Sequence, residues 1–129
     1  MTASVKQLLE AAHAVVPRIG AEQAEDMVKQ GAVVIDVRDA PEVETTGKID
    51  GALHISRGML EFRADPESPF HDKRLSKDKP IIVYCASGGR AALAAKVLRD
   101  FGYTAYNLGG FKEWADNGGA VDKPIDRGM

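Results

Sequence analysis

The first apolar residues of the chain recur at helical spacing. Ser4, a residue type that caps helix N-termini, precedes them, and Pro17 follows. The spacing predicts an amphipathic helix over Ser4–Val16, within an N-terminal extension of residues 1–17. A second helix is predicted over residues 21–30, with acidic residues in its first turns and Gly31 after its end. Between the two helices, residues 18–20 are expected to form a short edge strand.

Short runs of apolar, often β-branched residues follow at regular intervals. Four are predicted to be strands: AVVIDV (32–37), ALHI (52–55), IIVY (81–84) and TAYNL (104–108). Continuous apolar runs of this kind are typical of strands buried on both faces of a parallel sheet. Helical patterns separate the strands, over 41–44, 59–63, 90–101 and 111–117. The alternation predicts a three-layer α/β fold, with a central, mostly parallel sheet and helices on both faces.

One long segment has no hydrophobic period. Residues 64–80, ADPESPFHDKRLSKDKP, contain three prolines and charges of both signs. So long a connection inside a compact domain is more often functional, for example a lid, than idle. We expect a single domain over residues 18–119, followed by a loosely docked tail over 120–129.

Composition narrows the class of protein. The 129 residues are 44% hydrophobic and 28% charged, which is typical of one globular domain. A net charge of -2 without a basic tract favours neither a nucleic-acid partner nor a membrane partner. No apolar run is long enough to span a bilayer, and the N-terminus lacks the pattern of a signal peptide. A single cysteine excludes a disulfide within the chain and a multi-thiolate zinc site, so a reducing, cytoplasmic location fits best.

That cysteine, Cys85, lies where a predicted strand passes into a predicted helix. In an open parallel sheet, ligands bind beyond the carboxyl ends of the strands. The loop CASGGR follows the strand there, and its glycines allow backbone N–H groups to turn inward as an anion-binding nest. The helix N-terminus and Arg90 add positive charge, and such surroundings lower the pKa of a cysteine. Cys85 is therefore a candidate nucleophile, although a lone cysteine can also be a small packing residue.

The size of the loop indicates what the thiolate attacks. Cysteine-dependent phosphatases wrap a tetrahedral phosphate in a longer loop, whereas here only Ala86, Ser87, Gly88 and Gly89 separate Cys85 from Arg90. A smaller cradle suits a single sulfur atom carried on the cysteine as a persulfide, with its negative charge held by the loop N–H groups.

Three segments carry a resemblance to a known family. VYCASGGRAALAAKVLRDFGY, NLGGFKEW and, upstream, VVIDVRDAPEVETTGKIDGALHI resemble the motifs of the rhodanese family of sulfurtransferases, in its single-domain form. The resemblance covers most of residues 19–119, and it leaves the predicted N-terminal helix outside.

The resemblance implies a role for each matched residue. It makes Cys85 the catalytic nucleophile, places the active-site cradle on Ala86, Ser87, Gly88 and Gly89, and makes Arg90 the arginine that closes the loop. From the first motif, Asp36, Arg38 and Glu42 are expected to support that loop. Lys48 stands where the family usually has histidine, a departure that we expect to be peripheral.

The resemblance also implies a reaction, a double displacement. Cys85 takes a sulfur atom from a small anionic donor such as thiosulfate and passes it to cyanide, a thiol or a protein acceptor. No metal and no organic cofactor is expected. A persulfide carrier or a redox-sensing protein is the alternative interpretation, because the same thiol serves both purposes. A cysteine-dependent phosphatase or arsenate reductase is less favoured, and a non-catalytic binding module would have little reason to keep Cys85.

The remaining polar candidates can be assigned structural roles. Asp36 and Arg38 could form an ion pair at the end of a buried strand without any catalytic part. His54 is expected to pack within its strand, whereas His71, in the long connection, could approach the site. The scattered histidines do not make a metal site. Basic residues near that connection could attract an anionic donor: Arg57, Arg63, Lys73 and Arg74.

Overall fold

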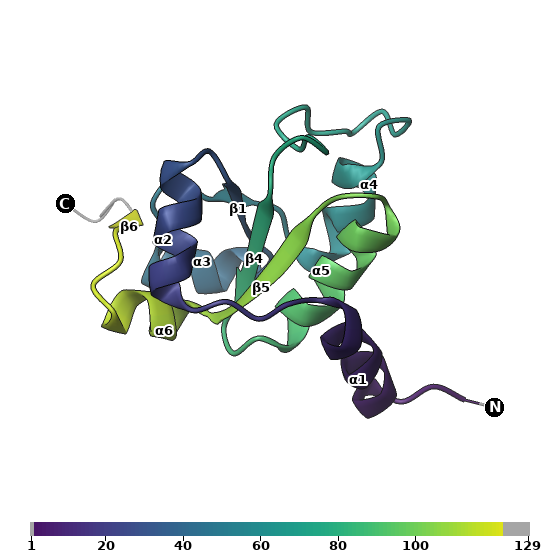
Figure 1. Cartoon of the computed structure of the whole chain (residues 1–129), viewed down its shortest axis with the longest axis horizontal. Helices are drawn as coiled ribbons and strands as arrows, with labels where there is room; N and C mark the ends of the chain where they lie inside the picture. The colour runs from purple at the N-terminus through teal and green to yellow at the C-terminus, as the bar shows by residue number, and fades with distance from the viewer. Residues whose placement is uncertain (1, 123–129) are drawn as a thin grey trace.

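The computed structural model describes residues 2–122, which fold around a parallel sheet (Figure 1). The sheet has four strands in the order β3-β1-β4-β5. Their bounds are β1 Val33–Asp36, β3 Leu53–His54, β4 Ile81–Cys85 and β5 Ala105–Gly110. Every pairing between them is parallel, and β1 and β4 pair from Val33 opposite Ile81 to Asp36 opposite Tyr84. The four predicted strands and their parallel arrangement are confirmed.

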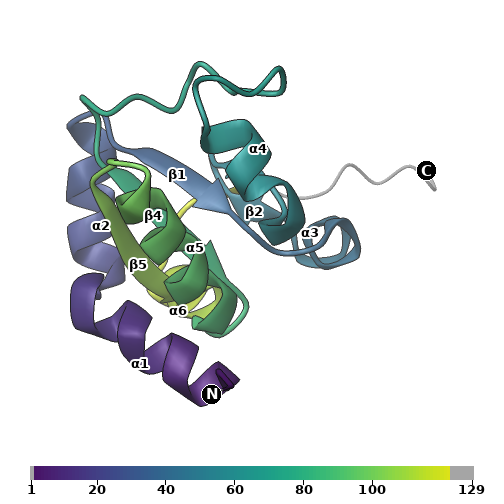
Figure 2. The same ribbon diagram turned by 90° about the vertical axis from the view of Figure 1, so that its right-hand side faces the viewer.

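Helices cover both faces of the sheet, which gives the three layers predicted from the sequence (Figure 2). Successive residues of a strand point to opposite faces of the sheet, so the side chains of β4 contribute to two hydrophobic cores, one on each face. Ile81 and Val83 pack with residues of the helices α4 (Leu60–Ala64) and α5 (Gly89–Asp100), whereas Ile82 and Tyr84 pack with residues of α2 (Ala21–Lys29) and α6 (Phe111–Asp116). Because β4 is fully buried along its length, its carboxyl end is held from both sides.

The helices begin and end close to where the patterns predict them. Their bounds are α1 Val5–Val15, α2 Ala21–Lys29, α3 Ala40–Thr46, α4 Leu60–Ala64, α5 Gly89–Asp100 and α6 Phe111–Asp116, with a 3-10 turn at Arg57–Met59. Ser4 caps α1 as expected, through a capping box with Gln7. α1 packs against α5, burying Ala12 and Val16. The N-terminal helix therefore rests on its own chain.

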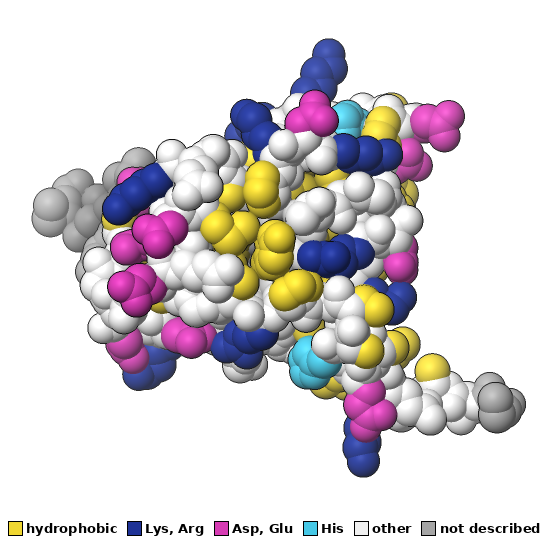
Figure 3. All heavy atoms as spheres, in the orientation of Figure 1, with side chains coloured by type: hydrophobic (Ala, Val, Ile, Leu, Met, Phe, Trp, Pro, Cys, Tyr) yellow, Lys and Arg dark blue, Asp and Glu magenta, His cyan; other side chains and the backbone are white. Residues whose placement is uncertain are grey.

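Part of α1 nevertheless faces solvent. Val5, Leu8 and Val15 are about half exposed or more. In the space-filling view, hydrophobic side chains lie along this helix and also gather over the centre of that face, and charged side chains of both signs lie around them (Figure 3). Among residues 2–122, no helix combines the length and apolar character needed to cross a bilayer.

Two short strands were not predicted. β2 (Lys48–Ile49) and β6 (Val121–Asp122) pair antiparallel, and Lys48 forms an ion pair of 3.3 Å with Asp122. Val121 and Asp122 lie in the segment expected to be a tail, of which residues 123–129 lie outside the described part. Residues 18–20 form a single parallel bridge, Arg18 with Asn107, rather than a strand.

The long connection lies far from Cys85. Residues 65–80 lead into the amino end of β4, whereas Cys85 ends that strand, and both views show the connection and the loop before α5 at opposite ends (Figures 1 and 2). Here Arg74 pairs with Asp72 at 2.7 Å. The expectation of a lid, and of His71 near the site, is therefore wrong, because the chain must return to the start of a parallel strand before it can reach the site.

Candidate functional site

Cys85 is the last residue of β4, and its sulfur points into the loop that follows. Sγ accepts hydrogen bonds from the backbone N–H groups of Gly88, at 3.0 Å, and Ala91, at 3.4 Å. Only 1% of the residue is exposed, whereas Ala86 and Ser87 are exposed on the outer part of the loop. The loop and the helix that follows it therefore direct one N–H donor each at the sulfur, part of the anion-binding nest predicted from the sequence.

The conformation of Gly88 makes this arrangement possible. Gly88 has φ +114° and caps the N-terminus of α5, and α5 begins at Gly89. An L side chain rarely adopts that backbone conformation, so glycine is required. Ala91 lies in the first turn of α5, where N–H groups have no partner within the helix. The helix therefore adds its free donors and its positive end to the sulfur site.

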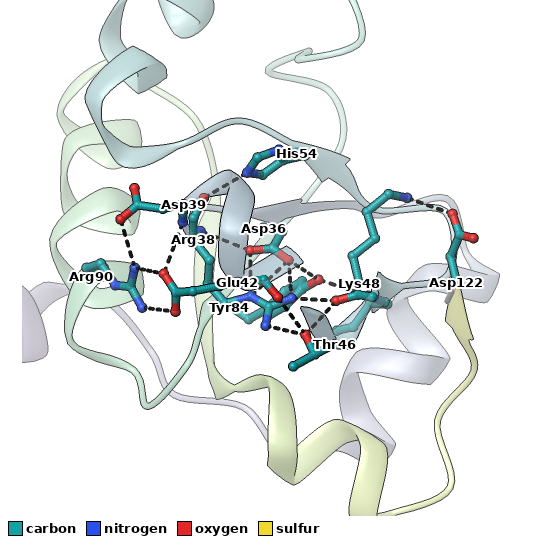
Figure 4. Close-up of polar contacts among 12 residues, drawn as sticks. Asp36, Arg38, Asp39, Glu42, Thr46, Lys48, His54, Tyr84, Arg90 and Asp122 are labelled. Carbon is teal, nitrogen blue, oxygen red and sulfur yellow. Dashed lines mark hydrogen bonds and ion pairs between the residues drawn. The ribbon is translucent and has the colours of Figure 1, made fainter. Parts of the chain in front are cut away.

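Arg90 closes the loop through an ion pair with Glu42. The guanidinium donates to both carboxylate oxygens, at 2.6 and 2.9 Å, and Asp39 lies 4.0 Å away (Figure 4). The hydrogen bonds from Arg90 lower the pKa of Glu42 to about 2, and the same pair raises the pKa of Arg90. Arg90 is therefore bound to α3, so the two segments of chain that carry the predicted motifs are tied together at the loop.

Asp36 and Arg38 form a buried network below this pair (Figure 4). Asp36 accepts hydrogen bonds from the Arg38 side chain, at 2.8 and 3.1 Å, and from the Tyr84 hydroxyl at 2.6 Å. Burial, followed by the bond to Asp36, raises the pKa of Tyr84, so this hydroxyl remains a donor. Arg38 also donates to the Gly47 carbonyl at 2.7 Å, beyond the end of α3. The network fixes both ends of the β1–α3 segment, and none of these hydrogen bonds involves the Cys85 sulfur.

A surface pocket of about 490 Å³ adjoins the loop between α3 and α6. Ala86 forms one wall and Phe111 another, and the Phe111 ring lies 4.5 Å from the Arg38 guanidinium. The remaining lining residues are Arg38, Pro41, Glu42, Thr45, Thr46 and Lys112. An organic molecule that approaches the loop from this side meets a largely apolar surface.

The end of β5 is a part of the site that the sequence pattern did not reveal. Gly110 pairs with Cys85, and a Cβ added to Gly110 would lie 2.6 Å from the Ala86 carbonyl oxygen. Asn107 is buried, and its carboxamide accepts from the Gly109 N–H at 2.8 Å and faces the Gly88 carbonyl at 3.4 Å. The adjacent glycines in NLGGF are the signal of this close approach.

The other candidates lie outside the loop. The His54 side chain is hydrogen-bonded to the Arg38 carbonyl at 2.7 Å and is exposed. The expectation that His54 is a packed strand residue is therefore wrong. Lys48 pairs with Asp122 on the far side of the network from Arg90 (Figure 4). Within residues 2–122, no group of histidine, cysteine, aspartate and glutamate side chains is arranged to hold a metal ion.

Two solved structures resemble nearly the whole chain. A Rhodopseudomonas palustris protein described as a possible tyrosine phosphatase is 38% identical, with a TM-score of 0.85, and the match covers 95% of this chain and 96% of that one. The polysulfide-sulfur transferase homodimer of Wolinella succinogenes is 33% identical, with a TM-score of 0.74, covering 96% and 90%. Both matches are long enough to take in α1.

Curated proteins and a family model match shorter parts of the chain. Thiosulfate sulfurtransferase GlpE of Ectopseudomonas mendocina is 35% identical over 101 residues, covering 75% of this chain and 83% of that protein. The tRNA sulfurtransferase of Desulfurococcus amylolyticus is 34% identical over 85 residues, which are 66% of this chain and only 15% of that enzyme. The family model described as Rhodanese-like domain matches residues 20–117. The chain therefore belongs to the rhodanese-like family, whose sulfurtransferase members its motifs resemble.

Proposed function

We propose that this protein is a rhodanese-type sulfurtransferase that carries sulfane sulfur from thiosulfate, or from a persulfide donor, on Cys85. The observation that carries the proposal is the pair of N–H groups, from Gly88 and Ala91, that point at the sulfur. Donors placed in this way stabilise negative charge both on a thiolate and on the outer sulfur of a persulfide. The sulfur-transferring relatives support the same chemistry.

The first half of the reaction loads the cysteine. The Cys85 thiolate attacks the outer sulfur of thiosulfate and forms a new S–S bond. The S–S bond of thiosulfate breaks, and its electron pair leaves with sulfite. Cys85 now carries the persulfide, whose terminal sulfur lies within the loop.

The second half of the reaction passes the outer sulfur of the Cys85 persulfide to an acceptor. A nucleophilic acceptor, cyanide or a thiolate, attacks the outer sulfur, and the electron pair of the persulfide bond returns to Cys85. Thiocyanate or an organic persulfide leaves, and the thiolate is regenerated. Neither half consumes an electron or a metal ion, so no cofactor is part of the proposal. A reducing, cytoplasmic location is part of it, since a free thiol must persist between cycles.

Arg90 and Glu42 act on the loop rather than on the sulfur in this account. The guanidinium donates to both carboxylate oxygens of Glu42 and stays charged. Its contribution is to hold the first turn of α5, and with it the Ala91 N–H, against α3. Asp36 and Arg38 support the other end of α3 through Gly47.

A steady-state assay tests the proposal. Thiocyanate formation from thiosulfate and cyanide is measured for the native protein, for Cys85→Ser and for Arg90→Lys. The native protein should turn over, Cys85→Ser should be inactive while remaining folded, and Arg90→Lys should be slower because it lacks the bidentate pair. Native-like turnover by Cys85→Ser would show that the reaction does not proceed through this thiol.

The descriptions of two relatives suggest alternatives to thiosulfate as the substrate and to sulfur transfer as the reaction. A polysulfide donor is supported by the Wolinella succinogenes relative, and the Rhodopseudomonas palustris description raises phosphatase chemistry. The alternatives separate in one set of assays, in which thiosulfate, polysulfide and p-nitrophenyl phosphate are compared as substrates of the same preparation. Hydrolysis of the phosphate ester without sulfur transfer would favour a phosphatase. A loaded Cys85 that releases its sulfur only to another protein would favour a persulfide carrier.

A further inference from the structure

The chain segment before the family match reaches the back of the catalytic loop. The Rhodanese-like match begins at residue 20, and residues 17–19 lie along the outer edge of β5. The Asn107 N–H donates to the Pro17 carbonyl and the Ile19 N–H donates to the Asn107 carbonyl, both at 3.0 Å. Both backbone polar groups of Asn107 are thus held by this segment.

Arg18 places its guanidinium on the end of β5. Gly109 has φ +96°, and a Cβ added there would lie 2.5 Å from Arg18 Cζ, so only glycine admits this contact. Arg18 Nε donates to the Leu108 carbonyl at 3.3 Å, and Nη2 pairs with Glu113 at 2.9 Å. The side chains of this ion pair are both about half exposed, so the pair by itself contributes little to stability. What Arg18 supplies is a planar group packed against the strand end.

Asn107 links this packed strand end to the catalytic loop. Its side-chain oxygen accepts from the Gly109 N–H, which fixes its amide nitrogen toward the Gly88 carbonyl. Gly88 also lies close to Gly109, because a Cβ added at Gly88 would lie 3.4 Å from Gly109 Cα. The Gly88 N–H, in turn, is the donor that lies 3.0 Å from Cys85 Sγ.

We infer that Arg18 and Asn107 are positioning residues for the sulfur site, and that they act by holding Gly88 so that its N–H points at Cys85. The inference rests on the proposed function and extends it to a segment outside the family match. If the Gly88 backbone shifts by well under a bond length, its N–H no longer points correctly at Cys85 Sγ. That N–H must be in place before negative charge develops on the sulfur. Effects of this kind on rate are commonly tenfold or more.

The test compares two substitutions of these residues with a matched control. Arg18→Gln removes the packed guanidinium from a half-exposed position and should not impair folding. Asn107→Asp keeps the acceptor for Gly109 and replaces the donor facing the Gly88 carbonyl with an oxygen. Glu113→Gln is the control, because it removes the ionic partner of Arg18 and leaves the guanidinium against Gly109.

Two measurements are made on each variant. The first is hydrogen exchange of the Gly88 amide by NMR, relative to the Ile35 amide in the core. The second is the rate of sulfite release in a single turnover, at several thiosulfate concentrations. We expect Arg18→Gln and Asn107→Asp to raise Gly88 exchange and to lower the saturated rate, each by about tenfold. The thiosulfate KM should change by less than about twofold in both variants, and Ile35 exchange should do the same in Arg18→Gln. In Asn107→Asp, Ile35 exchange should also rise, because a buried carboxylate destabilises the whole fold, so the saturated rate of the folded protein is the deciding measurement for this variant. Glu113→Gln should behave as the native protein.

The inference is overturned if Gly88 exchange and the saturated rate are unchanged in both substitutions. It is also overturned if Gly88 and Ile35 exchange rise together in Arg18→Gln, which would indicate general destabilisation, or if Glu113→Gln reproduces the effect. If no variant, nor the native protein, releases sulfite, the proposed function fails. The Gly88 exchange pattern then still decides whether Arg18 and Asn107 hold the loop.

Discussion

At the scale of single residues, the site depends on a few donors and one ion pair. The sulfur of Cys85 is held by the N–H groups of Gly88 and Ala91, and Arg90 next to them is bound to Glu42. The carboxylate makes two short bonds to one guanidinium, a geometry that lysine could not reproduce. The residue-level expectation is that this pair controls how α3 and the loop respond to acid.

The pH dependence of unfolding tests the Glu42 pair. The folded protein depresses the pKa of Glu42 from 4.5 to about 2. A depressed carboxyl pKa contributes stability that is fully present above the unfolded value and is lost as pH falls toward the folded value. The difference in the free energy of unfolding between native protein and Glu42→Gln should therefore be constant above about pH 5 and should shrink between about pH 4.5 and 2. Urea unfolding at a series of pH values measures it; a difference that does not change in this range would contradict the prediction.

The sequence was informative at this scale for Cys85 and its loop, and not for the residues behind them. A cysteine between a strand and a glycine-rich helix start indicates a nucleophile, and the resemblance also indicated Glu42. Asn107 gave no such signal, because an asparagine in an apolar run can equally be a turn residue or a buried bridge. Its role follows from a pairing between β5 and residues 17–19, which only the folded chain brings together.

At the scale of elements, the site is where β4, β5, α3 and α5 meet. α5 can approach the sheet closely because the side chains on its buried face are small: Ala91, Ala92, Ala94 and Ala95. The end of β5 also approaches the loop closely, because Gly110 has no side chain to separate it from Ala86. These contacts between elements set the position of the loop more tightly than the loop sequence alone.

Gly110→Ala tests the contact between β5 and the loop. The new methyl group would lie 2.6 Å from the Ala86 carbonyl oxygen, so the loop backbone must move. We expect thiosulfate turnover to fall by about tenfold or more and the free energy of unfolding to fall by about 1–3 kcal/mol. Gly20→Ala is the matched control, since a Cβ there has no neighbour within 4 Å and φ is -89°. Equal activity of the two variants would refute a close contact at Gly110.

The order and type of the long elements were predictable, whereas the shortest pairings were not. β1, β4 and β5 lie in apolar runs that are long enough to indicate buried strands of a parallel sheet. β3 has only two residues, but it lies within the apolar run ALHI, whereas β2 and β6, also of two residues each, lie in no such run and are held by a pairing between distant segments. The long connection was misjudged for a related reason: its composition shows that it is irregular and does not show at which end of the sheet it lies.

At the scale of the whole molecule, the N-terminal helix is joined to the catalytic unit. α1 packs on α5, the helix whose first turn faces the sulfur, and residues 17–19 then run along β5. The two solved relatives that match nearly the whole chain have a matching segment, whereas the family model starts after it. We therefore expect α1 to unfold together with the rest of the chain.

Ala12→Asp tests this expectation. Ala12 is fully buried against α5, so a carboxylate there would be placed in an apolar contact without a partner. The free energy of unfolding should fall by about 2–4 kcal/mol in a single cooperative transition. Ala14→Asp, at an exposed position near the end of the same helix, should lower it by only about 1 kcal/mol, through lower helix propensity and an acidic charge near the helix C-terminus. If Ala12→Asp released α1 and left the urea transition of the remainder in place, the helix would be an independent appendage.

Sulfur transfer through Cys85 is tested most directly by the intact mass of the protein before and after incubation with thiosulfate. Native protein should gain the mass of one sulfur atom, release one equivalent of sulfite and return to its original mass with cyanide, while Cys85→Ser should gain nothing. A native protein whose mass is unchanged by thiosulfate and by polysulfide, with Cys85 still titratable as a free thiol, would contradict sulfur transfer through this loop.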